Sequence, residues 1–288
     1  MLQKSANYLR LAPLALISLA AAWGLAFVIM KDSIERQSVN SFLFTRFGIA
    51  TLVLLALRPM ILRHITKDLF IKAFIAGLLL GAGYILQTEG LARTTAAITG
   101  FITGLYVVAT PLISALFLKK KITLFTWGCV ALATIGLALL SLRGWSMGFG
   151  EFLVLLCALA FAGHIVALGQ WSAGRDVYAM TIVQLFAVTV LTGTFALIEG
   201  YEAPPDNQVW AVVFFTAIVA TAFGFIIQTW AQAHIESTKV AVILTLEVVF
   251  AAFFAITIGR ERMTLQVILG GIILLTAMYL IVIKEPSS

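Results

Sequence analysis

The stretch Leu11–Met30, LAPLALISLAAAWGLAFVIM, contains no charged residue and is about as long as a lipid bilayer is thick. A helix needs roughly 20 mostly apolar residues to cross the hydrocarbon core. Nine further, mostly apolar stretches follow along the 288-residue chain: Ser41–Leu57, Ala73–Thr88, Thr94–Leu118, Ile122–Leu142, Phe152–Ser172, Val177–Ile198, Val209–Ala233, Val240–Ile258 and Met263–Ile283. Arg46 interrupts the first of these nine and Glu247 the eighth. The sequence therefore predicts an all-α integral membrane protein with ten transmembrane helices.

The composition agrees with a membrane protein. Hydrophobic residues make up 61% of the chain, charged residues 11%, and the mean hydropathy is +1.06. A soluble domain carries about 25% charged residues, and the short loops here leave no room for one. The first stretch also has features of a secretory signal peptide, with Lys4 and Arg10 ahead of an apolar run. It is longer than the usual apolar region of such a peptide, which favours a helix.

The net charge of +6 indicates membrane orientation rather than nucleic-acid binding, because the basic residues lie in the loops. With the N-terminus in the cytoplasm, twelve lysines and arginines fall in inner loops and tails, among them Lys119, Lys120 and Lys121, and six fall outside. The acidic loop Glu199–Gln208 then lies outside. Both termini are predicted to be cytoplasmic.

The two halves of the chain resemble each other. Because each half contains five predicted spans, the second half enters the membrane from the opposite side, as in the inverted repeats of secondary transporters. We therefore predict two inverted five-helix repeats, residues 1–145 and 146–288. The matches are Gly83 with Gly224 and Gln87-Thr88 with Gln228-Thr229 at a shift of 141, and Trp23-Gly24 with Phe161-Ala162 and Arg46 with Gln184 at a shift of 138.

Polar and aromatic side chains recur at helical spacing in two spans. They are Thr99, Thr103, Tyr106 and Thr110 in the fourth span, and Thr221, Phe225, Gln228 and Gln232 in the eighth. The repeat gives Phe225 and Gln228 the partners Tyr84 and Gln87. An amide can both donate and accept hydrogen bonds, so it suits either an ammonium or a carboxylate. These faces either line a cavity or join helices as packing contacts.

Three ionisable residues and one tryptophan lie inside predicted spans and are candidates for function. Arg46 lies near the outer end of its span, from which a long side chain can reach the interface. His164 either bonds as a neutral imidazole or titrates near neutral pH. Glu247 either binds an ammonium group, carries a proton, or pairs with Arg46 or His164. Trp23 is deeper than an interfacial tryptophan, beside Gly24.

Small residues and a proline indicate how some spans pack. Gly77 and Gly81 form one GxxxG pattern, and Gly100 and Gly104 form another. We read both as close helix contacts, and they allow sliding between the third and fourth spans. Pro111 is expected to kink the fourth span.

Several short motifs resemble the EamA family of the drug/metabolite transporter superfamily, and more closely its bacterial aromatic amino-acid exporters. They are Ala22-Trp23-Gly24, Phe44-Thr45-Arg46-Phe47, Gly104–Leu112, Leu246-Glu247 and Gly259-Arg260-Glu261-Arg262. The chain departs from the family pattern at Val248, where proline is common, and at Lys120, where glutamate is common. The resemblance implies a multi-pass protein of the bacterial inner membrane, and the departures weaken the assignment of a substrate.

The sequence thus predicts a secondary transporter that exports aromatic and other neutral amino acids by alternating access through a central cavity. The alternatives are an exporter of other small metabolites or drugs, and a pore-like facilitator. Enzyme motifs such as HExxH, GxSxG and a P-loop are absent from the sequence, so we expect no catalysis. We expect a small-molecule substrate and membrane lipids as partners, and no nucleic acid, cofactor or metal. The predicted substrate-binding residues are Trp23, Tyr84, Gln87, Thr99, Thr103, Tyr106, His164, Gln228 and Glu247.

Overall fold

The computed structural model describes residues 2–118, 123–143, 146–234 and 237–284, so Lys119, Lys120 and Lys121 lie outside the described residues. The described chain is helical apart from two short paired strands between its halves. The elements of the first half are α1 (Leu2–Glu35), α2 (Val39–Leu57), η1 (Pro59–His64), α3 (Lys67–Leu91), α4 (Ala96–Thr103), α5 (Tyr106–Leu118), α6 (Leu124–Ser141) and β1 (Leu142–Arg143). The others are β2 (Ser146–Met147), α7 (Phe149–Trp171), α8 (Val177–Glu199), α9 (Asn207–Phe215), η2 (Thr216–Phe223), α10 (Gly224–His234), α11 (Ser237–Leu244), α12 (Leu246–Thr257) and α13 (Leu265–Lys284).

Seven helical segments of the described chain are long and apolar enough to cross a membrane. Three shorter apolar helices, Trp127–Leu137, Leu246–Thr257 and Leu265–Leu280, lie within the remaining predicted spans. The third span begins at Lys67, ahead of the apolar stretch, as the snorkelling of Lys72 allows. The all-helical prediction is confirmed, and the number of ten crossings stays a prediction.

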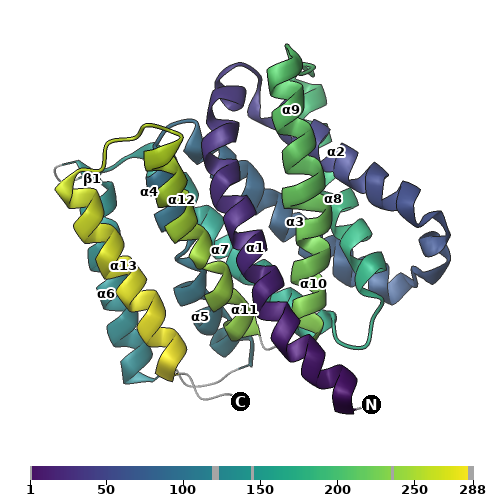
Figure 1. Cartoon of the computed structure of the whole chain (residues 1–288), viewed down its shortest axis with the longest axis horizontal. Coiled ribbons are helices and arrows are strands. Elements are labelled where there is room, and N and C mark those ends of the chain that lie inside the picture. The colour runs from purple at the N-terminus through teal and green to yellow at the C-terminus, as the bar shows by residue number, and fades with distance from the viewer. Residues whose placement is uncertain (1, 119–122, 144–145, 235–236, 285–288) are drawn as a thin grey trace.

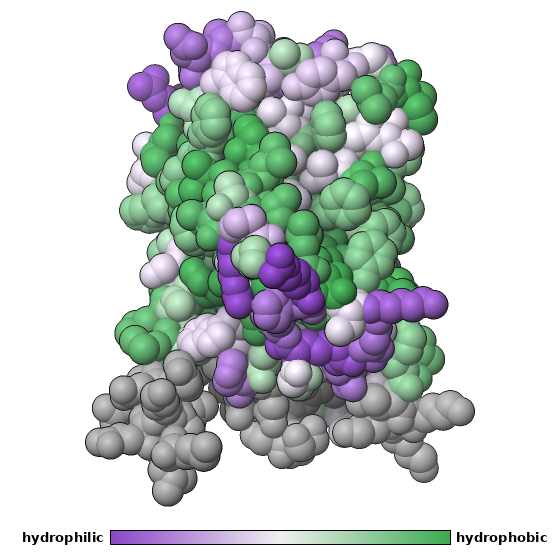
Figure 2. Space-filling model, turned by 90° about the vertical axis from the view of Figure 1, so that its right-hand side faces the viewer, coloured by the Kyte–Doolittle hydropathy of each residue, from purple (hydrophilic) through white to green (hydrophobic). Residues whose placement is uncertain are grey.

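The helices form one bundle with both ends of the chain at the same end. Figure 1 shows α6 and α13 together at one edge, α2 and η1 at the opposite edge, and α1 running diagonally between them. The start of α1 and the end of α13 lie at the lower end of this view, and the start of α9 lies at the upper end. Figure 2 shows a broad band of apolar side chains on one face, with hydrophilic residues above and below it. Such a band suits contact with lipid.

Several contacts between helices recur when the two halves are exchanged. α2 packs against α8, and α6 packs against α13, so each of these pairs joins equivalent helices of the two halves. α1 packs against α11 and α12, just as α7 packs against α4 and α5. α3 packs against α8, and its counterpart η2 packs against α2. The centre of the bundle is therefore shared equally by both halves.

Two helices that the sequence predicts as continuous are broken at equivalent positions. α4 ends at Thr103 and α5 begins at Tyr106, while α11 ends at Leu244 and α12 begins at Leu246. At both breaks a carbonyl accepts a hydrogen bond from the residue three positions ahead: Gly104 from Val107 at 3.1 Å, and Thr245 from Val248 at 3.0 Å. The positions of these two bonds differ by 141, which is the repeat shift.

The break in the first half does not require Pro111, and the kink expected at this proline stays a prediction. It lies inside α5, beyond the break, and its counterpart in the second half is Ala252. A break that occurs with and without proline must depend on the surrounding packing.

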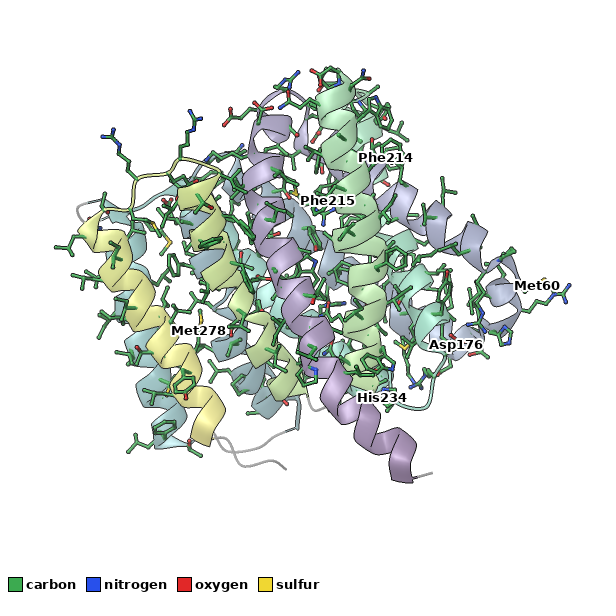
Figure 3. The ribbon with its side chains drawn as sticks, viewed as in Figure 1. Met60, Asp176, Phe214, Phe215, His234 and Met278 are labelled. Atoms are coloured by element: carbon green, nitrogen blue, oxygen red, sulfur yellow. The ribbon has the colours of Figure 1, made fainter. Side chains whose placement is uncertain are left out.

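The two broken helices cross each other close to their breaks. A Cβ added to Gly100 would lie 2.8 Å from Cβ of Ala251, and one added to Gly104 would lie 2.5 Å from the side chain of Val248. Met278 points inward from α13 in Figure 3, and its Cε would lie 2.9 Å from the same added Cβ of Gly104. The pattern Gly100-x-x-x-Gly104 is therefore a helix contact, as predicted, and its partner is α12. It is not the contact between the third and fourth spans that we expected.

Close approach of backbones also joins α3 to α8. A Cβ added to Gly77 would lie 2.5 Å from the carbonyl oxygen of Gln184 and 2.7 Å from Cβ of Ala187. No real Cβ approaches a backbone atom so closely, so any side chain at Gly77 must push the helices apart. The second GxxxG pattern thus packs across the two halves.

We expect Gly77→Ala to lower the free energy of unfolding by about 1–3 kcal/mol, the usual cost of overpacking a well-packed site. The matched control is Gly128→Ala, because a Cβ at Gly128 has nothing within 4 Å. Thermal unfolding of both variants in detergent is the measurement. Equal melting temperatures for the two would contradict the close approach of α3 and α8.

Candidate functional site

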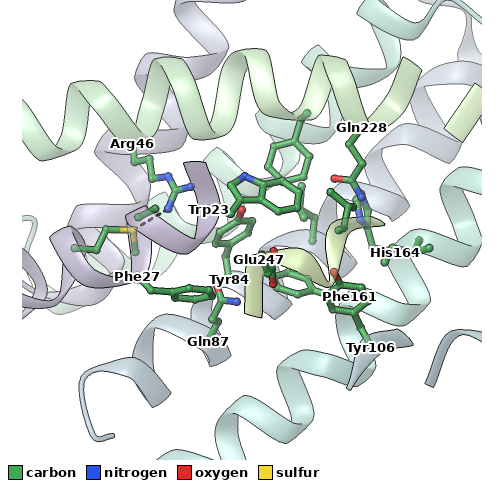
Figure 4. A pocket seen from close by; sticks show the side chains of 16 residues that line it. Trp23, Phe27, Arg46, Tyr84, Gln87, Tyr106, Phe161, His164, Gln228 and Glu247 are labelled. Atoms are coloured by element: carbon green, nitrogen blue, oxygen red, sulfur yellow. Dashed lines mark hydrogen bonds between the residues drawn. The ribbon is translucent and has the colours of Figure 1, made fainter. Parts of the chain in front are cut away.

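A cavity lies at the centre of the bundle, where α1, α2, α3, α5, α7, α10, α11 and α12 meet. The cavity has a volume of about 50 Å³, which is small beside the roughly 300–1,000 Å³ of small-molecule sites. Its wall comes from both halves of the chain, and most of the side chains are apolar or aromatic. Figure 4 shows this cavity from close by.

Twelve of the sixteen lining residues form pairs related by the repeat shifts. The cavity therefore lies where the equivalent parts of the two halves face each other, which is the place that inverted repeats use for a substrate. The pairs at a shift of 138 are Trp23 with Phe161, Ala26 with His164 and Phe27 with Ile165, and those at 141 are Tyr84 with Phe225, Gln87 with Gln228 and Tyr106 with Glu247.

Tyr84 is the centre of an aromatic cluster on the cavity wall. Its ring packs edge-on against Phe47 at 4.9 Å, Phe161 at 5.3 Å and Phe225 at 6.0 Å between ring centroids. Trp23 extends the cluster, with its ring 5.7 Å from Phe225. Edge-to-face packing fixes the orientation of each ring. The result is a rigid apolar wall suited to a flat hydrophobic group.

A stretch of π-helix in η2 provides two of the contacts that shape the cavity. The indole nitrogen of Trp23 donates a hydrogen bond to the carbonyl oxygen of Ala220 at 2.7 Å, and the Thr221 hydroxyl accepts one from Arg46. The equivalent part of α3 is ordinary α-helix. π-helical turns are rare and occur often at functional sites, because they change the register of carbonyls and side chains.

Two fully buried polar atoms of cavity-lining residues have no hydrogen-bond partner among the described residues. They are the hydroxyl oxygen of Tyr106 and Oε1 of Gln228, and both residues are 3% exposed. The amide of Gln87 differs, because its nitrogen donates to Thr103 at 3.2 Å. Leaving a buried polar atom unpaired is costly, so a bound molecule is a natural partner for both atoms.

His164 is held by its neighbour rather than paired with a carboxylate. Its Nε2 lies 2.8 Å from Oε1 of Gln184, and the Gln184 amide donates to the carbonyl oxygen of Met180. Gln184 is the repeat counterpart of Arg46. The second half thus uses a neutral amide and an imidazole where the first half has a guanidinium.

Arg46 points into the protein and does not reach the interface, contrary to one expectation from the sequence. It is 1% exposed, and its Nε donates to the Thr221 hydroxyl at 2.8 Å. Its Nη1 lies 3.2 Å from the sulfur of Met30, a weak acceptor. The guanidinium carbon is 5.0 Å from the ring centroid of Tyr84 and 5.3 Å from that of Phe47.

Glu247 is the first carboxylate after the break between α11 and α12 and lines the cavity opposite Tyr106. It is 4% exposed. Within the described part of the chain it forms no ion pair with Arg46 or His164, and no hydrogen bond reaches its carboxylate. Its nearest electrostatic neighbours are the phenols of Tyr84 and Tyr106 and the thiol of Cys157.

The cavity gathers most of the predicted site residues. Seven of the nine line it, and Thr103 lies behind Gln87. Thr99 is fully buried, bonds back to the carbonyl oxygen of Thr95 and does not line the cavity. Among the described residues no cluster has the side chains to hold a metal ion. The lining residues outside the predicted set are Ala26, Phe27, Met30, Arg46, Leu80, Phe161, Ile165, Phe225 and Leu244. The sequence had pointed to Phe225 by its helical spacing and the repeat, to Phe161 by the repeat, and to Arg46 as an ionisable residue inside a span.

Tyr106→Phe removes a hydroxyl that has no partner, so we expect the free energy of unfolding to stay constant or rise by about 1 kcal/mol, while substrate affinity falls. The matched control is Tyr178→Phe, because the Tyr178 hydroxyl donates to the carbonyl oxygen of Leu54 at 2.6 Å. That variant should lose about 1 kcal/mol of stability and keep its affinity. A marked loss of stability in Tyr106→Phe with unchanged binding would contradict this role.

Comparison with known proteins gives a family and a fold. The model of the EamA-like transporter family matches twice, at residues 10–142 and 148–283. An uncharacterized transporter of Archaeoglobus fulgidus is 34% identical over 95% of this chain and 86% of its own length. The uncharacterized transporter YoaV of Bacillus subtilis is 25% identical over 93% of this chain and 95% of its own. A solved crystal structure shares the fold, with a TM-score of 0.67 and 15% identity over 94% of each chain. The chain therefore belongs to the EamA-like transporter family and is a multi-pass membrane transporter of small molecules.

Proposed function

We propose that the protein is a secondary transporter that exports aromatic and other neutral amino acids by alternating access through the central cavity. The proposal rests on one observation: the same cavity has an aromatic wall and, at Tyr106 and Gln228, polar atoms without a hydrogen-bond partner. A neutral amino acid presents an apolar side chain and two charged groups on one carbon atom. Its side chain would pack against the rings, and its polar groups would meet the polar side chains of the cavity wall.

We propose that residues 1–145 and 146–288 are two five-helix repeats of opposite orientation, which together cross the membrane ten times. The family model matches each half once. The breaks in the fourth and ninth spans have equivalent positions, and several contacts between helices recur when the halves are exchanged. The three shorter apolar helices would complete the ten crossings.

The breaks supply a physical basis for alternating access. A broken helix can bend where its regular hydrogen bonds are interrupted, while the segments on either side stay rigid. Here the two breaks cross next to the cavity, so bending α4 against α5, or α11 against α12, would change access from one side. Discontinuous helices at a repeat interface are a common feature of secondary transporters.

We expect the protein in liposomes to show counterflow, in which unlabelled phenylalanine inside drives uptake of labelled phenylalanine. A carrier that alternates exchanges one molecule for another, whereas a pore only equilibrates the concentrations. The same assay with other neutral amino acids, nucleosides, sugars and cationic drugs defines the substrate class. Counterflow with drugs or sugars but no amino acid would favour the exporter of other metabolites, and uptake without counterflow would favour the facilitator.

We also propose that both termini are cytoplasmic, because this orientation puts most of the lysines and arginines inside and the acidic loop Glu199–Gln208 outside. A cysteine at the exposed Asn207 should then react with a membrane-impermeant thiol reagent in intact cells. A cysteine at the exposed Ala173, in a predicted inner loop, is the control and should react only after lysis. The native Cys129 and Cys157 are buried. The reverse labelling pattern would invert the orientation.

A further inference from the structure

We infer that Arg46 and Glu247 bind the two charged ends of one zwitterionic substrate, with the guanidinium on its carboxylate and the Glu247 carboxylate on its ammonium group. This inference rests on the proposed function, because it assumes that the transported molecule occupies the central cavity. It adds the chemistry of recognition: the cavity should select molecules that carry both charges and an apolar group, and should reject amines and acids that carry only one charge.

The guanidinium of Arg46 lacks an anionic partner. Thr221 and Met30 are neutral acceptors, and the sulfur of Met30 is a weak one. No carboxylate of the described residues lies within ion-pair distance of Arg46. A guanidinium has five N–H donors in a planar fork that matches a carboxylate. Its contacts with the rings of Tyr84 and Phe47 orient the fork without satisfying the charge.

The carboxylate of Glu247 is in the complementary situation. It is 4% exposed, and no cation or hydrogen-bond donor among the described residues reaches it. Because Glu247 follows directly after a helix break, the crossing of α12 with α4 fixes its direction into the cavity. The partner it lacks is a cation, and an ammonium group within the cavity would supply it.

The two residues line the same cavity and still do not pair with each other. In the view of Figure 4, Arg46 lies at one end, Tyr106, His164 and Gln228 lie at the other, and Glu247 is between them. The phenol of Tyr84 lies close enough to interact electrostatically with both Arg46 and Glu247. A direct ion pair would need no ligand, whereas two separated and unpaired charges are best neutralised together by a zwitterion.

The repeat strengthens this interpretation, because neither charge has a charged counterpart. Gln184 is equivalent to Arg46, and Tyr106 is equivalent to Glu247. The duplicated fold therefore does not require a charge at either position. One positive and one negative side chain have been placed on different helices of different halves, and both face one cavity.

The test compares the binding of three compounds that share a phenyl ring: phenylalanine, phenethylamine, which lacks the carboxylate, and 3-phenylpropionate, which lacks the ammonium group. Dissociation constants are measured on the purified protein in detergent. Wild-type protein should bind phenylalanine at least about tenfold more tightly than either analogue, as expected for a charged hydrogen-bonded contact. Arg46→Gln should abolish the preference over phenethylamine, and Glu247→Gln should abolish the preference over 3-phenylpropionate.

Further variants test the same contacts in case Arg46→Gln or Glu247→Gln folds poorly. Arg46→Lys keeps the charge but loses the fork, and Thr221→Val keeps the fork but loses its anchor, so both should weaken binding of the two carboxylates and leave phenethylamine unchanged. Arg36→Gln and Glu89→Gln remove charges in partly exposed ion pairs, at residues that do not line the cavity, and should preserve all three affinities. The double variant Arg46→Gln/Glu247→Gln should bind the three compounds about equally.

Four outcomes would overturn the inference. Equal losses of affinity for all three compounds in both single variants would show general damage rather than recognition of charged ends. A double variant that melts higher than either single variant and keeps the preference for phenylalanine would show that Arg46 and Glu247 pair with each other. If amino acids undergo counterflow while the single variants keep the wild-type preferences, the inference fails and the proposed function stands. If wild-type protein binds none of the three compounds and carries no amino acid, both fail.

Discussion

The crossing of the two broken helices is the constraint on which the centre of this protein depends. Gly104 allows the side chain of Val248 to approach the backbone of the first broken helix, and Met278 fills the space beside it. Any larger residue at this crossing would separate α4 from α12. Because each break is followed at once by a residue on the cavity wall, the crossing also fixes the directions of Tyr106 and Glu247. The same helix crossing thus determines both how the helices pack and where the polar groups of the cavity lie.

The two halves place their helices around the cavity in similar ways, but the polar side chains that they contribute differ. The paired lining positions show that each half supplies the same helices to the cavity, yet their polar groups differ: Arg46 against Gln184, and Glu247 against Tyr106. The π-helix in η2 belongs to the second half alone and supplies Thr221, which orients Arg46. A symmetric frame can change between equivalent conformations, while an asymmetric lining can recognise a molecule whose two ends differ.

Much of the fold was predictable because hydropathy reports which solvent a segment meets. The apolar stretches indicated the helices. Helical spacing, the repeat and the polar or ionisable residues inside spans together indicated seven lining residues, since residues such as Gln87 and Gln228 stand out in otherwise apolar helices. The breaks were not predictable in this way. Thr245 replaces Gly104, and no proline is common to both breaks, so the local sequence carries no shared signal. Arg46 was misread for a related reason: its depth along α2 is visible in sequence, but its direction depends on η2, more than 170 residues away.

The asymmetry has a consequence for the proposed alternation. In an inverted repeat the second conformation arises when each half adopts the arrangement that the other half has now. Arg46 would then occupy surroundings like those of Gln184, whose partner His164 corresponds to Ala26 in the first half. The guanidinium would lose the Thr221 hydroxyl, and the imidazole that partners Gln184 would have no counterpart beside it. The empty cavity would therefore favour the present conformation, and a substrate carboxylate that travels with Arg46 would lower the free-energy difference between the two states. In this way a carrier can change conformation more readily when it is loaded than when it is empty.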